Sequence, residues 1–164
     1  MTADKDKLFN SLIKKADAIL KSKKDKTGKL KAICKLLKNH VSYYNFVGFY
    51  YVNKAQNELL LGPFEGQTTE HVRIPFGKGI CGQAAQQKKR FVIQDVSRET
   101  NYLSCSENVK AEIVVPIFCN DEIVGELDID SYSKSPFTKE DELFLKRICE
   151  KTAKLFKENS GYTE

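Results

Sequence analysis

The chain has 164 residues, of which 41% are hydrophobic and 30% are charged, and its 27 basic and 22 acidic side chains give a net charge of +5. This size and composition are typical of one globular domain that buries its core without disulfide support. The sequence contains neither an apolar run of about 20 residues nor an apolar segment near its N-terminus, so we expect a cytoplasmic protein without a membrane span or a secretory signal.

Two amphipathic helices are predicted at the N-terminal end, over residues 4–21 and 29–40. Apolar side chains recur there at steps of three and four residues, and Thr27-Gly28 is expected to end the turn between the helices. The densest basic run, residues 21–31, falls at this turn. Because it lacks interleaved aromatic residues and any nucleic-acid-binding motif, it indicates a solvated turn rather than a nucleic-acid site.

From residue 43 the pattern changes to short β-branched and aromatic segments, which predict strands. The expected strands are 45–52, 58–62 (closed by Pro63), 72–75, 90–94, 111–118 and 122–130. Their connections are mostly short, and short connections favour antiparallel pairing. Pro116 lacks an N–H and so predicts a bulge or an unpaired position in its strand.

A closing amphipathic helix is predicted from Thr138, with Asp141 as its capping partner. We therefore expect an α+β fold with a mostly antiparallel sheet of five or six strands, whose terminal helices pack on one face. Loops 62–71 and 95–110 would cover a ligand pocket on the other face. In a single domain, 4–41 would be the N-terminal helices, 43–131 the sheet and pocket, and 138–158 the final helix.

The stretch of residues 104–131, which contains the predicted hairpin of strands 111–118 and 122–130, carries the residues with the most evident chemistry. Cys105 precedes it, Glu112 lies near its start, and Glu126, Asp128 and Asp130 occupy alternate positions of its second strand. Alternate strand residues share one face, so the two aspartates are expected to lie together. An ordinary solvated sheet face is the alternative interpretation, and Glu126 is expected at the surface.

The five cysteines are widely spaced, and the sequence has no C-x-x-C pair. With only two histidines, this pattern predicts no metal site and no disulfide framework, while a transient catalytic disulfide stays open. Cys81 is expected in the first turn of a short helix that follows Gly77 and Gly79. There, backbone N–H groups and the helix dipole would lower the pKa of the thiol.

The order of these elements resembles the GAF domain, a small-molecule-binding fold. Five segments are similar, in sequence and in order, to the free methionine-(R)-sulfoxide reductases: N-F-V-G-F-Y at 45–50, G-P-F-E-G at 62–66, I-P-F-G-K-G-I-C-G at 74–82, E-I-V-V-P at 112–116 and L-D-I-D-S at 127–131. The resemblance covers about residues 30–158. Each segment alone is weakly diagnostic, but their ordered combination is specific.

The resemblance implies reduction of free L-methionine-(R)-S-oxide without a metal or an organic cofactor. Cys105 would attack the sulfoxide sulfur and become a sulfenic acid, and Cys81 would then form a disulfide with it. An external dithiol such as thioredoxin would regenerate both thiols. The pocket residues that it implies are Phe46, Tyr50, Glu112, Asp128 and Asp130. One carboxyl would stay protonated and act as the acid, and another would hold the substrate ammonium group.

The chain departs from the usual family pattern at three places. Trp is usual at the position of Phe46, G-H-I-A-C-D is usual at residues 101–106, and many members carry a third cysteine near the position of Phe91. A homodimer is common for such domains. Two alternatives stay open: a GAF sensor that binds a small molecule without turnover, and a redox-responsive regulator built on Cys81 and Cys105.

Overall fold

The computed structural model describes residues 2–104 and 106–157. Its α-helices are α1 (Thr2–Lys21), α2 (Lys26–His40), α3 (Gly79–Gln87) and α4 (Lys139–Lys157), and its short 3₁₀ helices are η1 (Lys54–Gln56) and η2 (Val96–Arg98). Its strands are β1 (Phe46–Asn53), β2 (Glu58–Glu65), β3 (Arg73–Pro75), β4 (Phe91–Ile93), β5 (Ala111–Cys119) and β6 (Glu122–Ser131).

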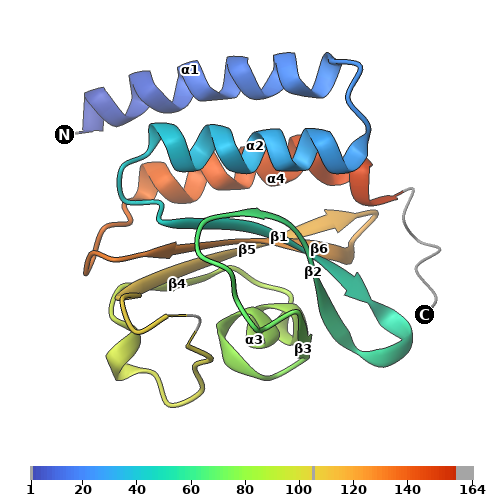
Figure 1. Ribbon diagram of the computed structural model, residues 1–164, viewed down its shortest axis with the longest axis vertical. Helices are drawn as coiled ribbons and strands as arrows, with labels where there is room; N and C mark the ends of the chain where they lie inside the picture. Colours follow the sequence, from blue (N-terminus) through green and yellow to red (C-terminus); the bar gives the residue numbers. More distant parts are fainter. Residues whose placement is uncertain (1, 105, 158–164) are drawn as a thin grey trace.

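The six strands form one sheet in the order β3-β2-β1-β6-β5-β4, and every pairing is antiparallel. Helices α2 and α4 cover one face, and α1 packs on them as an outer layer (Figure 1). Helix α3 and the connecting loops lie on the opposite face. The predicted α+β fold is thus confirmed, with α1 one layer further from the sheet than expected. None of the helices in the described ranges combines the length and the apolar character of a membrane span.

The main core lies between the sheet and the helices. Alternate residues of the central strands point into it, and buried residues of all three long helices meet them. The fully buried strand residues on this face are Val47, Phe49, Ile113, Ile117, Leu127 and Ile129. Full burial of one such side chain contributes about 1.5–3 kcal/mol. A second, smaller core on the other face joins the sheet to α3.

The β5–β6 hairpin fixes which side chains reach each core. Its turn residues Asn120 and Asp121 have φ values of 52° and 66°, as a two-residue type I′ turn requires. Pro116 pairs with Glu126 in register, and the irregularity lies at the next residues, between Ile117 and Phe118. The predicted disruption therefore occurs one residue beyond the proline.

Two predicted boundaries are wrong. The Asp25 side chain accepts a hydrogen bond from the Gly28 N–H at 2.8 Å, so α2 starts at Lys26, and Thr27-Gly28 lies inside its first turn. Strand β2 continues through Pro63 to Glu65. Pro63 lies at the irregularity of the β1–β2 ladder, where it has no paired residue, and β3 pairs only with residues 58–60, so the missing N–H costs no ladder bond.

A fully buried carboxylate, Asp141, joins three parts of the chain at the start of α4. Its Oδ2 accepts hydrogen bonds from Lys5 Nζ of α1 at 2.8 Å and from the Thr138 N–H at 2.9 Å. Its Oδ1 accepts from the hydroxyls of Tyr43 at 2.6 Å and Tyr44 at 2.7 Å. The predicted capping pair is therefore also the junction between α1, α4 and the segment that enters β1.

Candidate active site

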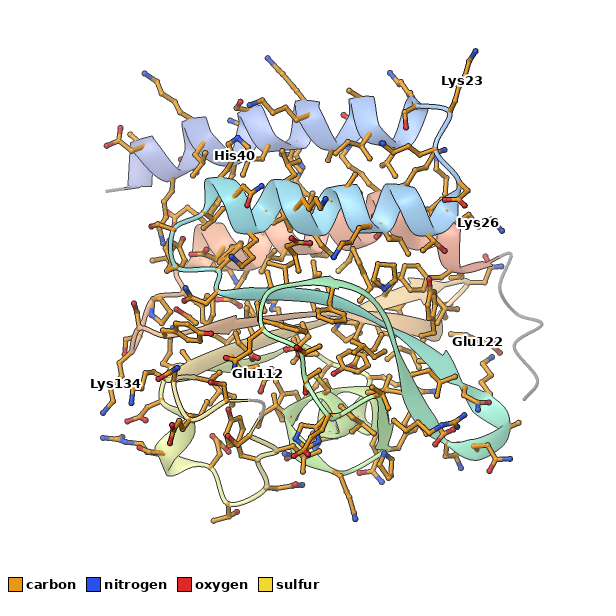
Figure 2. The ribbon with its side chains drawn as sticks, viewed as in Figure 1. Lys23, Lys26, His40, Glu112, Glu122 and Lys134 are labelled. Atoms are coloured by element: carbon orange, nitrogen blue, oxygen red, sulfur yellow. The ribbon has the colours of Figure 1, made fainter. Side chains whose placement is uncertain are left out.

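Four carboxylates lie on the sheet face that is turned toward α3. Glu126, Asp128 and Asp130 alternate along β6, and Glu112 of β5 pairs directly with Asp130. Each is at most 4% exposed. Figure 2 shows Glu112 on the side of the sheet away from the long helices. This burial contradicts both a solvated sheet face and the predicted surface position of Glu126, because β6 is a central strand and α3 packs over it.

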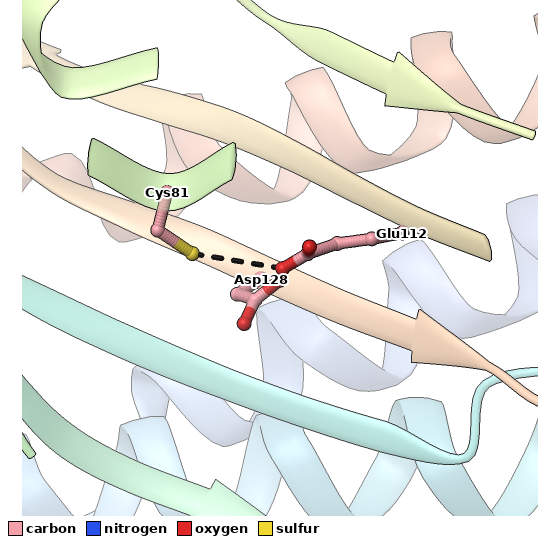
Figure 3. A group of neighbouring side chains, drawn as sticks. All are labelled: Cys81, Glu112 and Asp128. Atoms are coloured by element: carbon pink, nitrogen blue, oxygen red, sulfur yellow. Dashed lines mark hydrogen bonds between the residues drawn. The ribbon is translucent and has the colours of Figure 1, made fainter. Parts of the chain in front are cut away.

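Helix α3 places the Cys81 thiol directly over these carboxylates. Cys81 is the third residue of the helix, as predicted, and is 5% exposed. Its Sγ donates toward Oε2 of Glu112 across 3.7 Å (Figure 3). The ligand-type atoms of Cys81, Glu112 and Asp128 all lie within 4.8 Å of one another. A thiol and at least two carboxylates therefore meet at one point.

The predicted lowering of the Cys81 pKa is wrong. Burial raises the pKa of this thiol well above its ordinary value, and the charges of Asp128 and Glu112 raise it further. Burial and these charges raise the pKa of the thiol more than the helix N-terminus lowers it, because the helix acts through partial charges only. The surroundings of Cys81 thus favour its protonated thiol, which donates to the Glu112 carboxylate.

Burial also raises the pKa of the carboxyls on β6. It does so for Glu126, Asp128 and Asp130, and the charge of Asp128 raises the pKa of the other two further. Closely spaced buried carboxylates disfavour full ionisation of the group. Burial thus shifts these carboxyls toward their protonated form, which is the form that an acid catalyst requires.

Aromatic residues of β1 and β2 lie beside these carboxylates, and of them Tyr50 lines the pocket. Phe46 stacks on Phe64 with the ring centroids 5.6 Å apart, and Gly48 lies beneath both. A Cβ at Gly48 would come within 2.8 Å of the Phe46 ring, so the stacked rings require glycine there. Tyr50 is fully buried and donates its hydroxyl to the His71 carbonyl at 3.2 Å. These β1 residues face the carboxylates of the neighbouring strand β6.

The loop that leads to Cys105 is fastened to the start of α3. Asn101 accepts a hydrogen bond from the Gly79 N–H at 2.8 Å and donates one to the Gly77 carbonyl at 2.7 Å. Gly79 has φ +67°, and a Cβ there would lie 2.9 Å from Leu103. Only glycine fits this conformation and this contact easily. Cys105 itself lies outside the described residues.

A narrow pocket of about 10 Å³ lies among these elements. This volume is close to the minimum that holds one water, so a larger molecule could enter only if the lining side chains moved. The lining residues are Tyr50, His71, Ile74, Lys78, Gly79, Ile80, Cys81, Leu103, Glu112 and Asp128. Phe46 and Asp130 belong to the same sheet face but are not among them.

Comparisons with known proteins show the family of the chain. The GAF domain family matches residues 30–155. The protein YtsP of Bacillus subtilis is 36% identical over 149 residues, which are 91% of each chain. The free methionine-R-sulfoxide reductase of Escherichia coli is 36% identical over 120 residues, 73% of this chain and 71% of that one. The chain belongs to the free methionine-R-sulfoxide reductase family of GAF domains.

A solved structure supports the same family at the level of the fold. The free methionine-R-sulfoxide reductase from Neisseria meningitidis, in complex with its substrate, superposes with a TM-score of 0.85 at 32% identity. The match covers 91% of this chain and 88% of that chain. Every site residue predicted from the resemblance falls inside the part matched by the GAF family. The roles of these residues, including that of Cys105, stay predictions.

Sequence reasoning missed several residues around the family site. His71, Lys78 and Leu103 line the pocket from loops and a helix start, where no periodic pattern marks them. Glu126 carried a usable signal, because it continues the alternation of Asp128 and Asp130 by one step. That alternation predicts that Glu126 lies on the same strand face as the two aspartates. It does not predict how deeply Glu126 is buried.

The burial of Glu126 predicts an unusual stability effect. Neither carboxylate oxygen has a hydrogen bond of ordinary geometry within the described residues, and burial raises the pKa of Glu126 more than the nearby Cys81 thiol lowers it. An unsatisfied buried polar group costs about 1–3 kcal/mol, so Glu126→Leu should raise the free energy of unfolding by that amount at pH 7. Because folding raises the pKa of Glu126, wild-type stability falls as pH rises from about 4.3, and the advantage of the variant should grow over the same interval.

Urea denaturation between pH 4 and pH 8 measures this difference. Glu122→Leu is the matched control, because Glu122 lies exposed on the same strand. Its effect should stay below about 1 kcal/mol and change little over this pH range. A Glu126→Leu protein less stable than wild type at pH 7 would show that the carboxylate has a stabilising partner.

Proposed function

We propose that the protein reduces free L-methionine-(R)-sulfoxide to L-methionine through a thiol mechanism. The observation that carries this proposal is the Cys81 thiol, which is buried against Glu112 and Asp128 in a pocket that all three residues line. Family membership supports this reaction for the thiol and the carboxylates, because relatives of similar sequence are named free methionine-R-sulfoxide reductase.

The charge of the pocket supports a free amino acid as substrate. Glu112 and Asp128 offer negative charge at the base of the pocket, where a substrate ammonium group would be held by charge-assisted hydrogen bonds. A peptide-bound methionine sulfoxide has no such ammonium group. Tyr50 and Ile74 provide apolar surface for the side chain of the substrate.

In the first step, the Cys105 thiolate attacks the sulfoxide sulfur. A bond forms between the Cys105 sulfur and the substrate sulfur, a protonated carboxyl of the Asp128–Asp130 pair gives its proton to the sulfoxide oxygen, and the S–O bond breaks. The hydroxyl then bonds to the Cys105 sulfur as the bond between the two sulfurs breaks, so the products are methionine and a Cys105 sulfenic acid. Sulfur of the substrate is reduced by two electrons, and the Cys105 sulfur is oxidised by two. The raised pKa of both aspartates supports the acid role.

In the second step, Cys81 resolves the sulfenic acid. Its thiol proton passes to Glu112, Sγ attacks the Cys105 sulfur, and the hydroxyl leaves as water when a disulfide forms. The 3.7 Å contact between Sγ and Glu112 Oε2 supports this proton path. An external dithiol of the thioredoxin type then reduces the disulfide by thiol exchange and is itself oxidised.

Turnover of defined sulfoxides tests the proposal. With dithiothreitol as reductant, the wild-type protein should convert free L-methionine-(R)-sulfoxide and leave the (S)-epimer unchanged. N-acetylation removes the ammonium charge, so the N-acetyl substrate should lose at least about 100-fold in kcat/KM, as expected for a lost charge-assisted contact of about 3 kcal/mol. Stoichiometric binding of the free sulfoxide without methionine formation would favour the non-catalytic sensor instead.

A further inference from the structure

We propose that Cys81, Glu112 and Asp128 also form a binding site for a thiophilic divalent cation of the Zn²⁺ type, which blocks the site in its reduced state. The inhibitory part rests on the proposed function, whereas the binding itself rests on the geometry alone. The three residues come from α3, β5 and β6 and converge from two sides of the pocket (Figure 3).

The distances fit a tetrahedral ion. Zinc takes thiolate sulfur at about 2.3 Å and carboxylate oxygen at about 2.0–2.2 Å, so that these two ligands stand roughly 3.5 Å apart in a tetrahedral site. Cys81 Sγ and Glu112 Oε2 are 3.7 Å apart. The Asp128 ligand oxygen lies within 4.8 Å of both. A side-chain adjustment of about 1 Å at Asp128 would complete three ligand positions, with the fourth open to the pocket.

The unmet bonding capacity of Asp128 points to a ligand. Its Oδ1 is buried and has no hydrogen-bond partner within residues 2–104 and 106–157. The neighbouring Glu126 adds two more unpartnered oxygens on the same face. Lys78, a cationic residue of the pocket, stands exposed at its rim. A bound dication would therefore satisfy oxygens that the protein leaves unpaired.

The ligand chemistry selects the type of ion. Mg²⁺ and Ca²⁺ require oxygen ligands at six or more positions, which a site with a sulfur and two carboxylates does not supply. One thiolate with two carboxylates suits a borderline ion that accepts four ligands, such as Zn²⁺ or its spectroscopic substitute Co²⁺. Once Cys81 has entered a disulfide, its sulfur is no longer a thiolate ligand, so binding is confined to the reduced enzyme.

Cobalt titration of the reduced full-length protein tests the site. With a phosphine reductant present, Co²⁺ should bind at about one ion per chain and give a near-ultraviolet thiolate-to-metal charge-transfer band. Cys81→Ser should abolish the band, and Asp128→Asn should weaken Co²⁺ binding at least tenfold. The matched control is Cys119→Ser, which removes a half-buried thiol at the end of β5. It should leave the charge-transfer band and the affinity for Co²⁺ unchanged.

Two further measurements define the ligand set and the effect on activity. Cys105→Ser should retain the band, because the site needs one thiolate. ZnCl₂ should inhibit wild-type turnover, with recovery on adding a chelator. A band of full intensity in Cys81→Ser, its loss in Cys105→Ser, or unchanged affinity in Asp128→Asn would each overturn the site. Cobalt binding at Cys81 in a protein without reductase activity would refute only the proposed function, and activity insensitive to ZnCl₂ would refute the inhibition.

Discussion

Cys105→Ser should eliminate methionine formation altogether, whereas Cys81→Ser should still release about one equivalent of methionine per chain. We expect this difference because the nucleophile takes part in the reduction of the substrate, whereas the resolving thiol acts only after methionine has formed. In multiple turnover with thioredoxin as reductant, we expect both variants to fall by at least about 10³-fold, as is usual for the loss of a covalent catalyst. Steady-state rates alone therefore do not separate the two roles.

A single-turnover experiment separates them. Reduced, reductant-free enzyme is mixed with excess methionine sulfoxide, and methionine is quantified after acid quench. The Cys81→Ser chain should also retain a sulfenic acid that reacts with dimedone, while wild type should yield a disulfide. Cys149→Ser is the matched control, since Cys149 is a buried thiol of α4 that donates to the Val115 carbonyl on the helix side of the sheet. One equivalent of methionine from Cys105→Ser, and none from Cys81→Ser, would reverse the assignment.

Asp141→Ala should lower the free energy of unfolding by about 3–5 kcal/mol at pH 7. Removing the carboxylate leaves the charge of Lys5 without its partner in a buried ion pair, and the buried Tyr44 hydroxyl loses its acceptor. Glu150→Ala is the control on the same helix, because its side chain is exposed, and it should change stability by about 0.5 kcal/mol or less. Urea denaturation followed by circular dichroism measures both.

The pH dependence of this effect follows from the sign of the pKa shift. Burial alone would raise the pKa of Asp141, but Lys5 and the hydroxyls of Tyr43 and Tyr44 hold it below its ordinary value. The contribution of Asp141 to stability is thus fully present above about pH 3.9 and is lost as pH falls through the lower folded-state pKa. The gap between wild type and Asp141→Ala should therefore narrow below pH 4. A gap that stays constant down to pH 2 would mean that the charge of Asp141 is not its source.

The sequence predicted the elements well because their periodic patterns are strong. The hairpin of residues 111–130, its turn at Asn120 and the cap at Thr138 all depend on local rules that a single sequence displays. The boundary at Thr27-Gly28 was missed because Asp25, three residues before Gly28, caps the helix from outside the apolar pattern. The extension of β2 through Pro63 depends on where β3 stops pairing, which is a tertiary fact.

The candidate site was predictable in its membership more than in its electrostatics. The family resemblance and strand alternation brought Glu112, Asp128 and Asp130 together. The direction of the Cys81 pKa shift was predicted wrongly, because a helix position was visible in the sequence and the carboxylates beneath it were not. Local context favours thiolate at that position, and tertiary packing reverses the preference.

The central sheet works as a partition between two unlike environments. Along β6, Leu127 and Ile129 face a dry helical core, while Asp128 and Asp130 lie on the opposite face, where Asp128 lines the pocket. Substitutions on the pocket face can therefore change chemistry without disturbing the contacts that hold the helices. A GAF domain built in this way can lose or gain catalysis through a few positions of one strand face while its architecture is inherited intact. The two-residue turn at Asn120-Asp121 sets the register of the β5–β6 hairpin. It is therefore the part of this arrangement that is least tolerant of an insertion or a deletion.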